Sequence, residues 1–145
     1  FWHSDLLASL IWFLKNELGS AYRVVGGELG YWVERGKTWR SLDLAVFRYE
    51  DVKDRLESDE YIDVPPVLVV EIDVRAEVES DLEYVWEKSE QLLESGVEKV
   101  VWIFTRPRKV FVFEKGKRPT IYDWGEEVEL LEGVKLHLND LLNRP

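Results

Sequence analysis

Two acidic residues at the end of an apolar stretch are the first candidates for chemistry in this sequence. The apolar residues 67–70 lead directly into Glu71-Ile72-Asp73. Because alternate residues of a strand point to the same face, we expect Glu71 and Asp73 to project side by side. Partly buried neighbouring carboxylates are costly unless a cation neutralises them. The pattern therefore indicates a cation site; the alternative is that the strand ends at Glu71 and both acids lie in solvent.

Two further residues could join such a site. Asp43 is a lone acid in the otherwise largely apolar stretch 39–47, where it needs either a core ion pair or a metal ion. Lys88 lies on the flank of an apolar helical stripe that runs from Leu82 to Leu93. A lysine there could direct its ammonium group towards the carboxylates, or could extend into solvent as an ordinary surface lysine.

The elements that must position these residues follow from hydrophobic periodicity and from turn residues. An amphipathic helix is expected over 4–18, with Ser4 as its N-cap and Gly19 as its end. The helix that carries Lys88 is expected to end at Gly96, after an irregular acidic segment that reaches Asp81. The strands are expected at 21–25, 28–35, 39–47, 67–73, 97–104, 110–113, 120–122 and 127–131, with a loop or helical turn over 48–63 and a short helical turn over 136–142. The helix before residue 97 predicts a parallel crossover between the two long buried strands.

Composition limits the classes of protein and of site. The 145 residues predict one domain, 1–145, and a hydrophobic content of 46% predicts a large core. No apolar run approaches the ~20 residues of a membrane span, so we expect a cytoplasmic protein with no membrane contact. The absence of cysteine excludes disulfides and thiolate metal sites, and two separated histidines argue against a histidine-rich centre. Nothing in the sequence indicates an organic cofactor.

The charge distribution sets how nucleic acid could be bound. The formal net charge is −10, so general attraction to DNA is absent. The basic residues Arg106, Arg108 and Lys109, with three more in 115–118, are concentrated within 13 positions. They are candidates for phosphate contacts, and hairpin solubility is the alternative explanation.

Together these residues suit metal-assisted phosphodiester hydrolysis. Asp43, Glu71 and Asp73 would form a hard oxygen site for Mg²⁺ or Mn²⁺, which polarises a phosphodiester oxygen and lowers the pKa of a bound water. Lys88 would orient the attacking water or stabilise charge that develops on phosphorus.

The order of these motifs resembles the PD-(D/E)XK restriction-endonuclease-like superfamily, and within it the Uma-type proteins. Those proteins are similar in carrying their lysine on the helix after the second acidic strand. Leu42 stands where the family has a proline, Leu92 where it has a tyrosine, and residues 73–76 replace its Ser-Pro-Ser segment. The segments that carry the resemblance are 42–46, 65–71, Lys88 with Gly96-Val97, 98–102, 106–108 and 132–138.

The resemblance implies an α/β, restriction-endonuclease-like core: a mixed central β-sheet flanked by helices. It also implies Mg²⁺ at Asp43 and Glu71, a DNA endonuclease activity and a homodimer. A second hypothesis keeps the nuclease fold in a non-catalytic interaction module, in which Trp2, Trp12 and Trp124 would supply an apolar surface for self-association. A third, suggested by the negative charge, is an acidic protein that mimics DNA.

Overall fold

The computed structural model describes residues 1–74 and 79–143. Its main feature is one mixed sheet, formed by two antiparallel strands, two parallel strands and a terminal meander. Residues 75–78, which include part of the segment predicted to be irregular and part of the replaced Ser-Pro-Ser segment, lie outside the described residues. The sheet order is β1-β2-β3-β4-β5-β6, and only β3 and β4 run parallel. Its strands are β1 (Tyr22–Glu34), β2 (Thr38–Arg48), β3 (Leu68–Asp73), β4 (Lys99–Phe104), β5 (Lys109–Glu114) and β6 (Thr120–Asp123).

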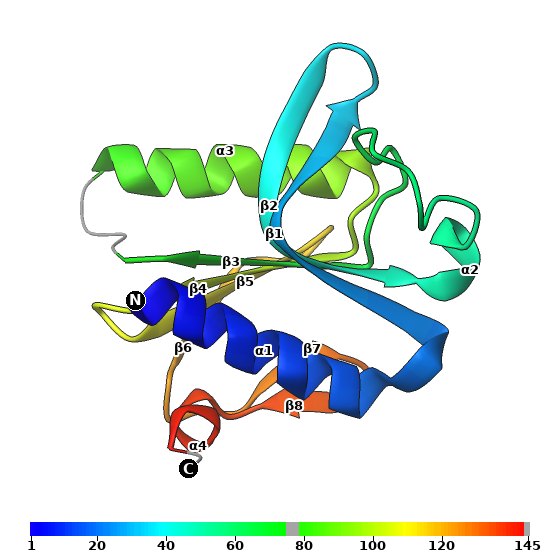
Figure 1. Ribbon diagram of the computed structural model, residues 1–145. Helices are drawn as coiled ribbons and strands as arrows, with labels where there is room; N and C mark the ends of the chain where they lie inside the picture. Colours follow the sequence, from blue (N-terminus) through cyan, green and yellow to red (C-terminus); the bar gives the residue numbers. More distant parts are fainter. Residues whose placement is uncertain (75–78, 144–145) are drawn as a thin grey trace.

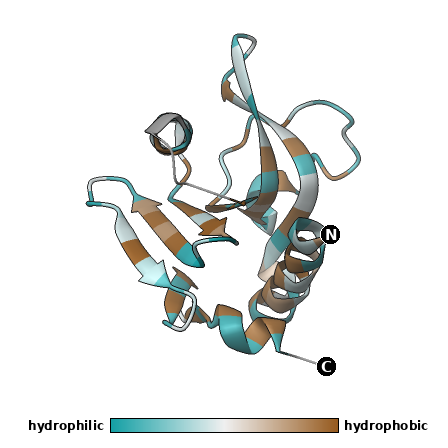
Figure 2. Ribbon diagram, turned by 90° about the vertical axis from the view of Figure 1, so that its left-hand side faces the viewer, coloured by the Kyte–Doolittle hydropathy of each residue, from teal (hydrophilic) through white to brown (hydrophobic). Residues whose placement is uncertain are grey.

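Helices cover both faces of this sheet (Figure 1). Helix α1 (Trp2–Leu18) lies on the face shared with the C-terminal elements, and helix α3 (Glu79–Ser95) lies on the opposite face, as Figure 1 and Figure 2 both show. The remaining elements are α1 (Trp2–Leu18), η1 (Gly19–Ala21), α2 (Tyr49–Val52), α3 (Glu79–Ser95), β7 (Val128–Leu131), β8 (Val134–Leu136) and α4 (Leu138–Leu142). The predicted mixed sheet flanked by helices is therefore confirmed. No helix in the described part of the chain is long and apolar enough to cross a membrane.

Alternation along β3 divides the core between the two faces. Leu68, Val70 and Ile72 pack with Leu10 and its neighbours on α1, whereas Val69 packs in the cluster beneath α3. Burying each such aliphatic side chain contributes about 1.5–3 kcal/mol. This two-sided burial explains why β3 is an unbroken apolar run, and it leaves Glu71 facing α3.

The crossover through α3 confirms the predicted parallel pair. β3 and β4 align from Leu68 opposite Lys99 to Asp73 opposite Phe104, so Glu71 lies beside Trp102. The Trp102 indole nitrogen donates a hydrogen bond of 2.8 Å to the Ser89 hydroxyl of α3, which ties this helix to the sheet at the level of Glu71.

Strand β1 contains a bulge opposite Asp43, where the sequence predicted a break between two strands. Gly26 pairs with Leu44 and Leu29 pairs with Leu42, so Gly27 and Glu28 lie opposite the single residue Asp43 and β1 carries one extra residue. Gly27 and Glu28 have positive φ angles of 91° and 62°. Such bulges bend a strand and redirect its side chains. Leu42 and Ala45, on either side of this point, both reach the α3-side core.

Several element boundaries differ from the predictions. Helix α1 begins at Trp2, so Ser4 is not its N-cap, and α3 begins at Glu79 instead of after Asp81. A short strand, β8, pairs antiparallel with β7 and was not predicted. The turn at 35–37, the helix end at Gly19 and the helix end before Gly96 agree with the predictions.

Candidate active site

Asp43 and Glu71 meet where β2 and β3 separate. The strand pairing runs from Val46 opposite Leu68 to Leu44 opposite Val70. At the next position the backbone N–H of Asp43 donates to Glu71 Oε2 at 2.8 Å, and the backbone N–H of Ile72 donates to Asp43 Oδ2 at 2.9 Å. Each carboxylate therefore accepts a bond from the other strand, which fixes both side chains at the end of the ladder.

Glu71 is deeply buried and pairs with Lys88. Its residue is 3% exposed, and its Oε1 forms an ion pair with the Lys88 ammonium. Burial raises the pKa of Glu71 to about 7, the nearby Asp43 adds to the rise, and the Lys88 ammonium opposes it. A carboxyl group with a pKa near neutrality loses its proton at little free-energy cost, either to a water molecule or when a cation binds in its place.

Lys88 is held in place from three directions. It is 5% exposed, so the alternative of a surface lysine is wrong. Its Nζ donates to the Ser41 carbonyl oxygen at 2.7 Å, and it lies 5.9 Å from the Tyr84 ring centre and 5.8 Å from that of Trp102. The carbonyl and the aromatic faces stabilise a buried ammonium and direct it at Glu71.

Asp73 lies on the same face of β3 as Glu71 but farther along, at the strand end. It is exposed, and its Oδ1 accepts a bond of 2.7 Å from the backbone N–H of Val74. Within residues 1–74 and 79–143, no three His, Asp or Glu side chains are grouped as a metal site. A ligand role for Asp73 remains a prediction.

The donor set nevertheless fits a small divalent cation. Mg²⁺ is commonly bound by one or two carboxylates and keeps several waters. Asp43 and Glu71 supply two carboxylates that are already locked together, and the Asp43 side chain is 25% exposed, so a hydrated ion can reach it. The Lys88 ammonium balances the charge of the Glu71 carboxylate.

His3 is a neighbour of this site that sequence reasoning missed. Its Nε2 lies 3.5 Å from Asp43 Oδ2, although His3 belongs to the first turn of α1. No local signal predicts this contact, because it depends on how α1 docks across the sheet.

The predicted basic cluster is divided between the two ends of β5. Arg106, Arg108 and Lys109 lie at the β4–β5 turn, where the backbone N–H of Arg106 donates to the Val74 carbonyl just beyond β3. The 115–118 turn lies at the opposite end of the same strand. The six cations therefore do not form one patch, and only the first three lie near the end of β3 that carries Asp73.

The three basic residues of the β4–β5 turn have different surroundings. The Arg108 guanidinium lies 5.7 Å from the Trp2 ring centre and 5.4 Å from that of Trp124, and Lys109 pairs with Asp123. Arg106 is exposed. Arg108 is thus an oriented guanidinium, whereas the charge of Lys109 is partly neutralised. Their contact with a substrate remains a prediction.

Comparisons with known proteins identify the family and the fold of this chain. Residues 1–142 match the model of the Uma2 family, described as "Putative restriction endonuclease". A crystal structure of a "putative nuclease" from Anabaena variabilis has a similar fold, with a TM-score of 0.72 and 18% sequence identity over 96% of this chain and 79% of that chain. No curated protein is significantly similar. Family and fold are those of restriction-endonuclease-like nucleases, and the chain belongs to the Uma2 family.

Proposed function

We propose that this protein is a divalent-cation-dependent endonuclease that hydrolyses DNA phosphodiester bonds. The observation that carries the proposal is the reciprocal locking of Asp43 and Glu71, with Lys88 buried against Glu71. Three charged groups brought together at the end of a strand ladder are expensive for stability, and such arrangements are concentrated at functional sites. Membership of the Uma2 family supports the same reaction class.

In this proposal Asp43 and Glu71 hold Mg²⁺ or Mn²⁺, with Asp73 as an auxiliary ligand or an acceptor for a coordinated water. When bound, the cation supplies a polarised phosphodiester oxygen and a more acidic water. The backbone bonds to Asp43 and Glu71 keep their oxygens oriented without further reorganisation.

Lys88 would act on the substrate side of the same site. Its ammonium group offsets the Glu71 charge, and the Ser41 carbonyl fixes its direction. With a bound cation neutralising Glu71, the Lys88 ammonium would be available to stabilise negative charge on the scissile phosphate or on the attacking water. Arg106, Arg108 and Lys109 would contact a neighbouring phosphate.

The test combines metal binding with cleavage. Thermal unfolding is measured with and without millimolar Mg²⁺ or Mn²⁺, and plasmid and single-stranded DNA are assayed for nicks. We expect the cation to raise the Tm of the wild type and not that of Asp43→Asn or Glu71→Gln, with cleavage lost in both variants. Glu132→Gln, an exposed acid in the β7–β8 turn, is the matched control and should behave as the wild type. An equal Tm shift in the wild type and both site variants would contradict the proposed site.

A non-catalytic interaction module with the nuclease fold is the second candidate. Lys88 already neutralises Glu71, and Trp2 and Trp12 are exposed large apolar side chains. Trp124, the third tryptophan predicted for such a surface, is 2% exposed and packs edge-on against Trp2, so that part of the prediction is wrong. This candidate predicts no cation shift, no cleavage, and a homodimer in analytical ultracentrifugation that Trp12→Ser weakens.

A further inference from the structure

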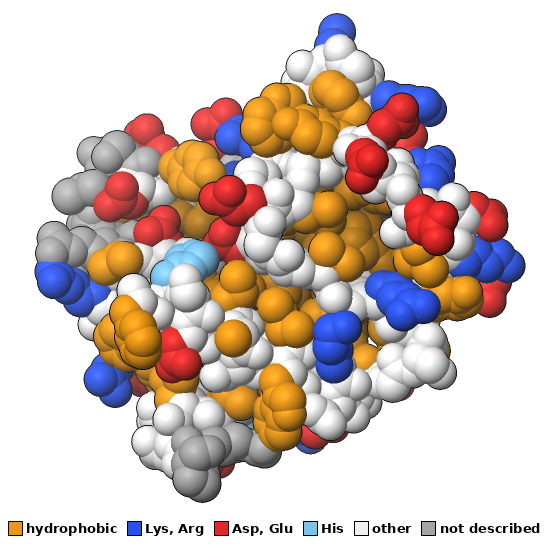
Figure 3. Space-filling model, in the orientation of Figure 1, with side chains coloured by type: hydrophobic (Ala, Val, Ile, Leu, Met, Phe, Trp, Pro, Cys, Tyr) orange, Lys and Arg blue, Asp and Glu red, His pale blue; other side chains and the backbone are white. Residues whose placement is uncertain are grey.

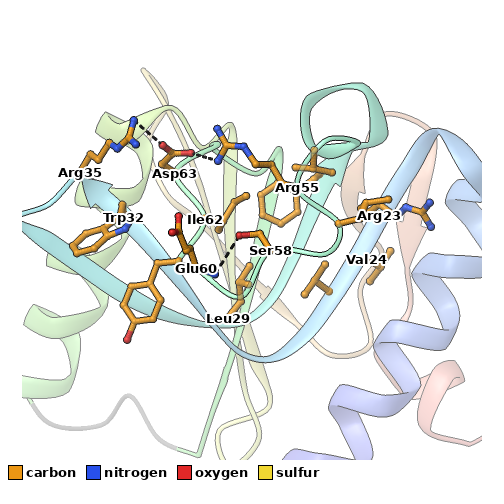
Figure 4. A pocket seen from close by; sticks show the side chains of 15 residues that line it. Arg23, Val24, Leu29, Trp32, Arg35, Arg55, Ser58, Glu60, Ile62 and Asp63 are labelled. Atoms are coloured by element: carbon orange, nitrogen blue, oxygen red, sulfur yellow. Dashed lines mark hydrogen bonds and ion pairs between the residues drawn. The ribbon is translucent and has the colours of Figure 1, made fainter.

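A second hollow lies on the molecule, away from the acidic site. It is a pocket of about 420 Å³ between β1, α2 and the segment 53–63 (Figure 4). Figure 3 shows its apolar floor, bordered by charged side chains. The volume falls within the ~300–1,000 Å³ typical of small-molecule sites. Neither Asp43, Glu71 nor Lys88 lines it, so it is independent of the proposed nuclease site.

The floor of the pocket is made of aliphatic and aromatic side chains from two strands, a short helix and the segment that follows it. Val25 and Leu29 come from β1, Phe47 from the end of β2, Val52 from α2, and Ile62 from the following segment. The segment is anchored by hydrogen bonds between Ile62 and β1, at 2.9 Å to Trp32 and 3.1 Å to Gly30. The wall on this side is therefore part of the sheet edge and not a loosely covering loop.

The rim carries three guanidinium groups in a strongly acidic protein. Asp63 binds two of them, Arg55 at 2.7 Å and Arg35 at 3.3 Å, and the Arg55 bond holds the pKa of Asp63 below its usual value. This trio keeps one net positive charge. Arg23 lines the opposite side, where its guanidinium lies 4.9 Å from the Tyr49 ring centre and, within the described residues, makes no ion pair.

We propose that this pocket binds a small amphipathic carboxylate: a short aliphatic chain or a single ring with one anionic head group. The apolar body would fill the floor, and the head group would lie at the mouth beside Arg23, which can accept it without breaking an existing ion pair. Among the described residues that line the pocket, Glu60 carries the one carboxylate outside the Asp63 trio, and it lies across the pocket from Arg23 in Figure 4.

Other ligand chemistries fit the lining less well. A nucleobase would leave its polar edges unpaired against Val25, Leu29 and Phe47, which costs free energy for each unsatisfied group. A cationic ligand would meet Arg23 and the positive trio. A neutral apolar ligand would use the floor but gain nothing from the rim.

The experiment uses anilinonaphthalene sulfonate, a fluorescent apolar anion, as the reporter and octanoate as the competitor. We expect the 145-residue protein to bind the reporter and octanoate to displace it, with 1-octanol, the neutral molecule of the same chain length, roughly tenfold weaker. Arg23→Glu should weaken octanoate roughly tenfold, whereas Arg118→Glu, the same charge change on an exposed arginine outside the pocket, should leave it unchanged.

A pocket-filling variant locates the binding. Val25→Trp keeps a residue suited to a strand and occupies the floor, so reporter fluorescence should be lost while circular dichroism is unchanged. If that variant does not fold, Arg23→Glu against Arg118→Glu still decides the matter. Equal displacement by octanoate and octanol, equal affinities in the two arginine variants, or better displacement by deoxyadenosine monophosphate than by octanoate would each overturn the proposal.

Discussion

The Glu71 carboxyl group is subject to two opposing effects. Burial disfavours its charged form, while the Lys88 ammonium favours it. The outcome is a pKa of about 7, well above the ordinary value of 4.5. In the proposed metal site, proton and metal would compete for the same oxygens close to neutral pH, so the protonation of this one residue should be measurable in both stability and metal binding.

The metal-free protein should become less stable as the pH rises through 7. The folded state holds the Glu71 proton more tightly than the unfolded state, so this contribution is complete below about pH 4.5 and is lost as the pH passes the folded pKa. The full effect is at most about 3 kcal/mol. Urea unfolding between pH 5 and 8.5 should show this slope in the wild type and not in Glu71→Gln. Added Mg²⁺ should stabilise most at high pH, and a slope shared by both proteins would assign it to other groups.

Lys88→Met should be strongly destabilising at pH 8 and much less so at pH 5. Without the ammonium, Glu71 is a buried, unpaired carboxylate at high pH, which costs about 3–5 kcal/mol, whereas at pH 5 it takes up a proton instead. Urea unfolding at the two pH values measures this difference. The double variant Glu71→Gln/Lys88→Met should recover stability at pH 8, because both charges are removed. Equal losses at both pH values would show that Lys88 acts by packing alone.

At the scale of elements, the bulge in β1 is the device that places Asp43. Opposite it, Leu42 and Ala45 reach the same core although they are three positions apart, and Asp43 lies at the irregular point between them. Gly26 also allows close packing of α1, since a Cβ there would lie 2.5 Å from Ile11 Cδ1. The bulge therefore links the docking of α1, which carries His3, to the position of Asp43.

Gly27→Ala should weaken metal binding as well as stability. Gly27 has a φ of 91° and open space around its Cα, so an alanine there meets no steric clash but is disfavoured by backbone strain of about 1–3 kcal/mol. The backbone would relieve this strain by changing the conformation of the bulge. Gly133→Ala in the β7–β8 turn is matched, with a φ of 78° and equally open surroundings. Both should lower the Tm, but only Gly27→Ala should lower Mn²⁺ affinity in isothermal titration calorimetry. Equal Mn²⁺ affinity in the two variants would show that the conformation of the bulge does not affect metal binding at Asp43.

The sequence predicts the elements that bury a continuous face, and it misses features created by docking. The apolar runs of β3 and β4 and the stripe of α3 are strong local signals, so the parallel crossover followed from them. The close approach of Ile11 to Gly26 beside the bulge and the His3–Asp43 contact both arise where α1 docks on the sheet. The burial of Lys88 could be inferred only together with Glu71, because an isolated lysine favours solvent.

The whole molecule is acidic, and this restricts how DNA could approach. With a net charge of −10, long-range attraction is unfavourable, so binding has to rely on a few local phosphate contacts and on bound cations. The β4–β5 turn is the better candidate for such contacts, because it lies near the end of β3 that carries Asp73, whereas the 115–118 turn lies at the opposite end of β5. Arg108 is oriented there by Trp2 and Trp124.

Arg108→Gln should therefore reduce both DNA affinity and its dependence on salt. Each phosphate contact that is lost lowers the slope of log K against log salt by about 0.9 for duplex DNA. Arg118→Gln removes the same charge at the far end of β5 and should leave the slope unchanged. Fluorescence anisotropy with a cleavage-resistant phosphorothioate duplex, titrated from low to moderate salt, measures both slopes. If the slope of log K against log salt falls equally in the two variants, the change reflects the net charge of the protein and not a contact at the β4–β5 turn. If the slope falls in neither variant, DNA approaches the acidic site from another side.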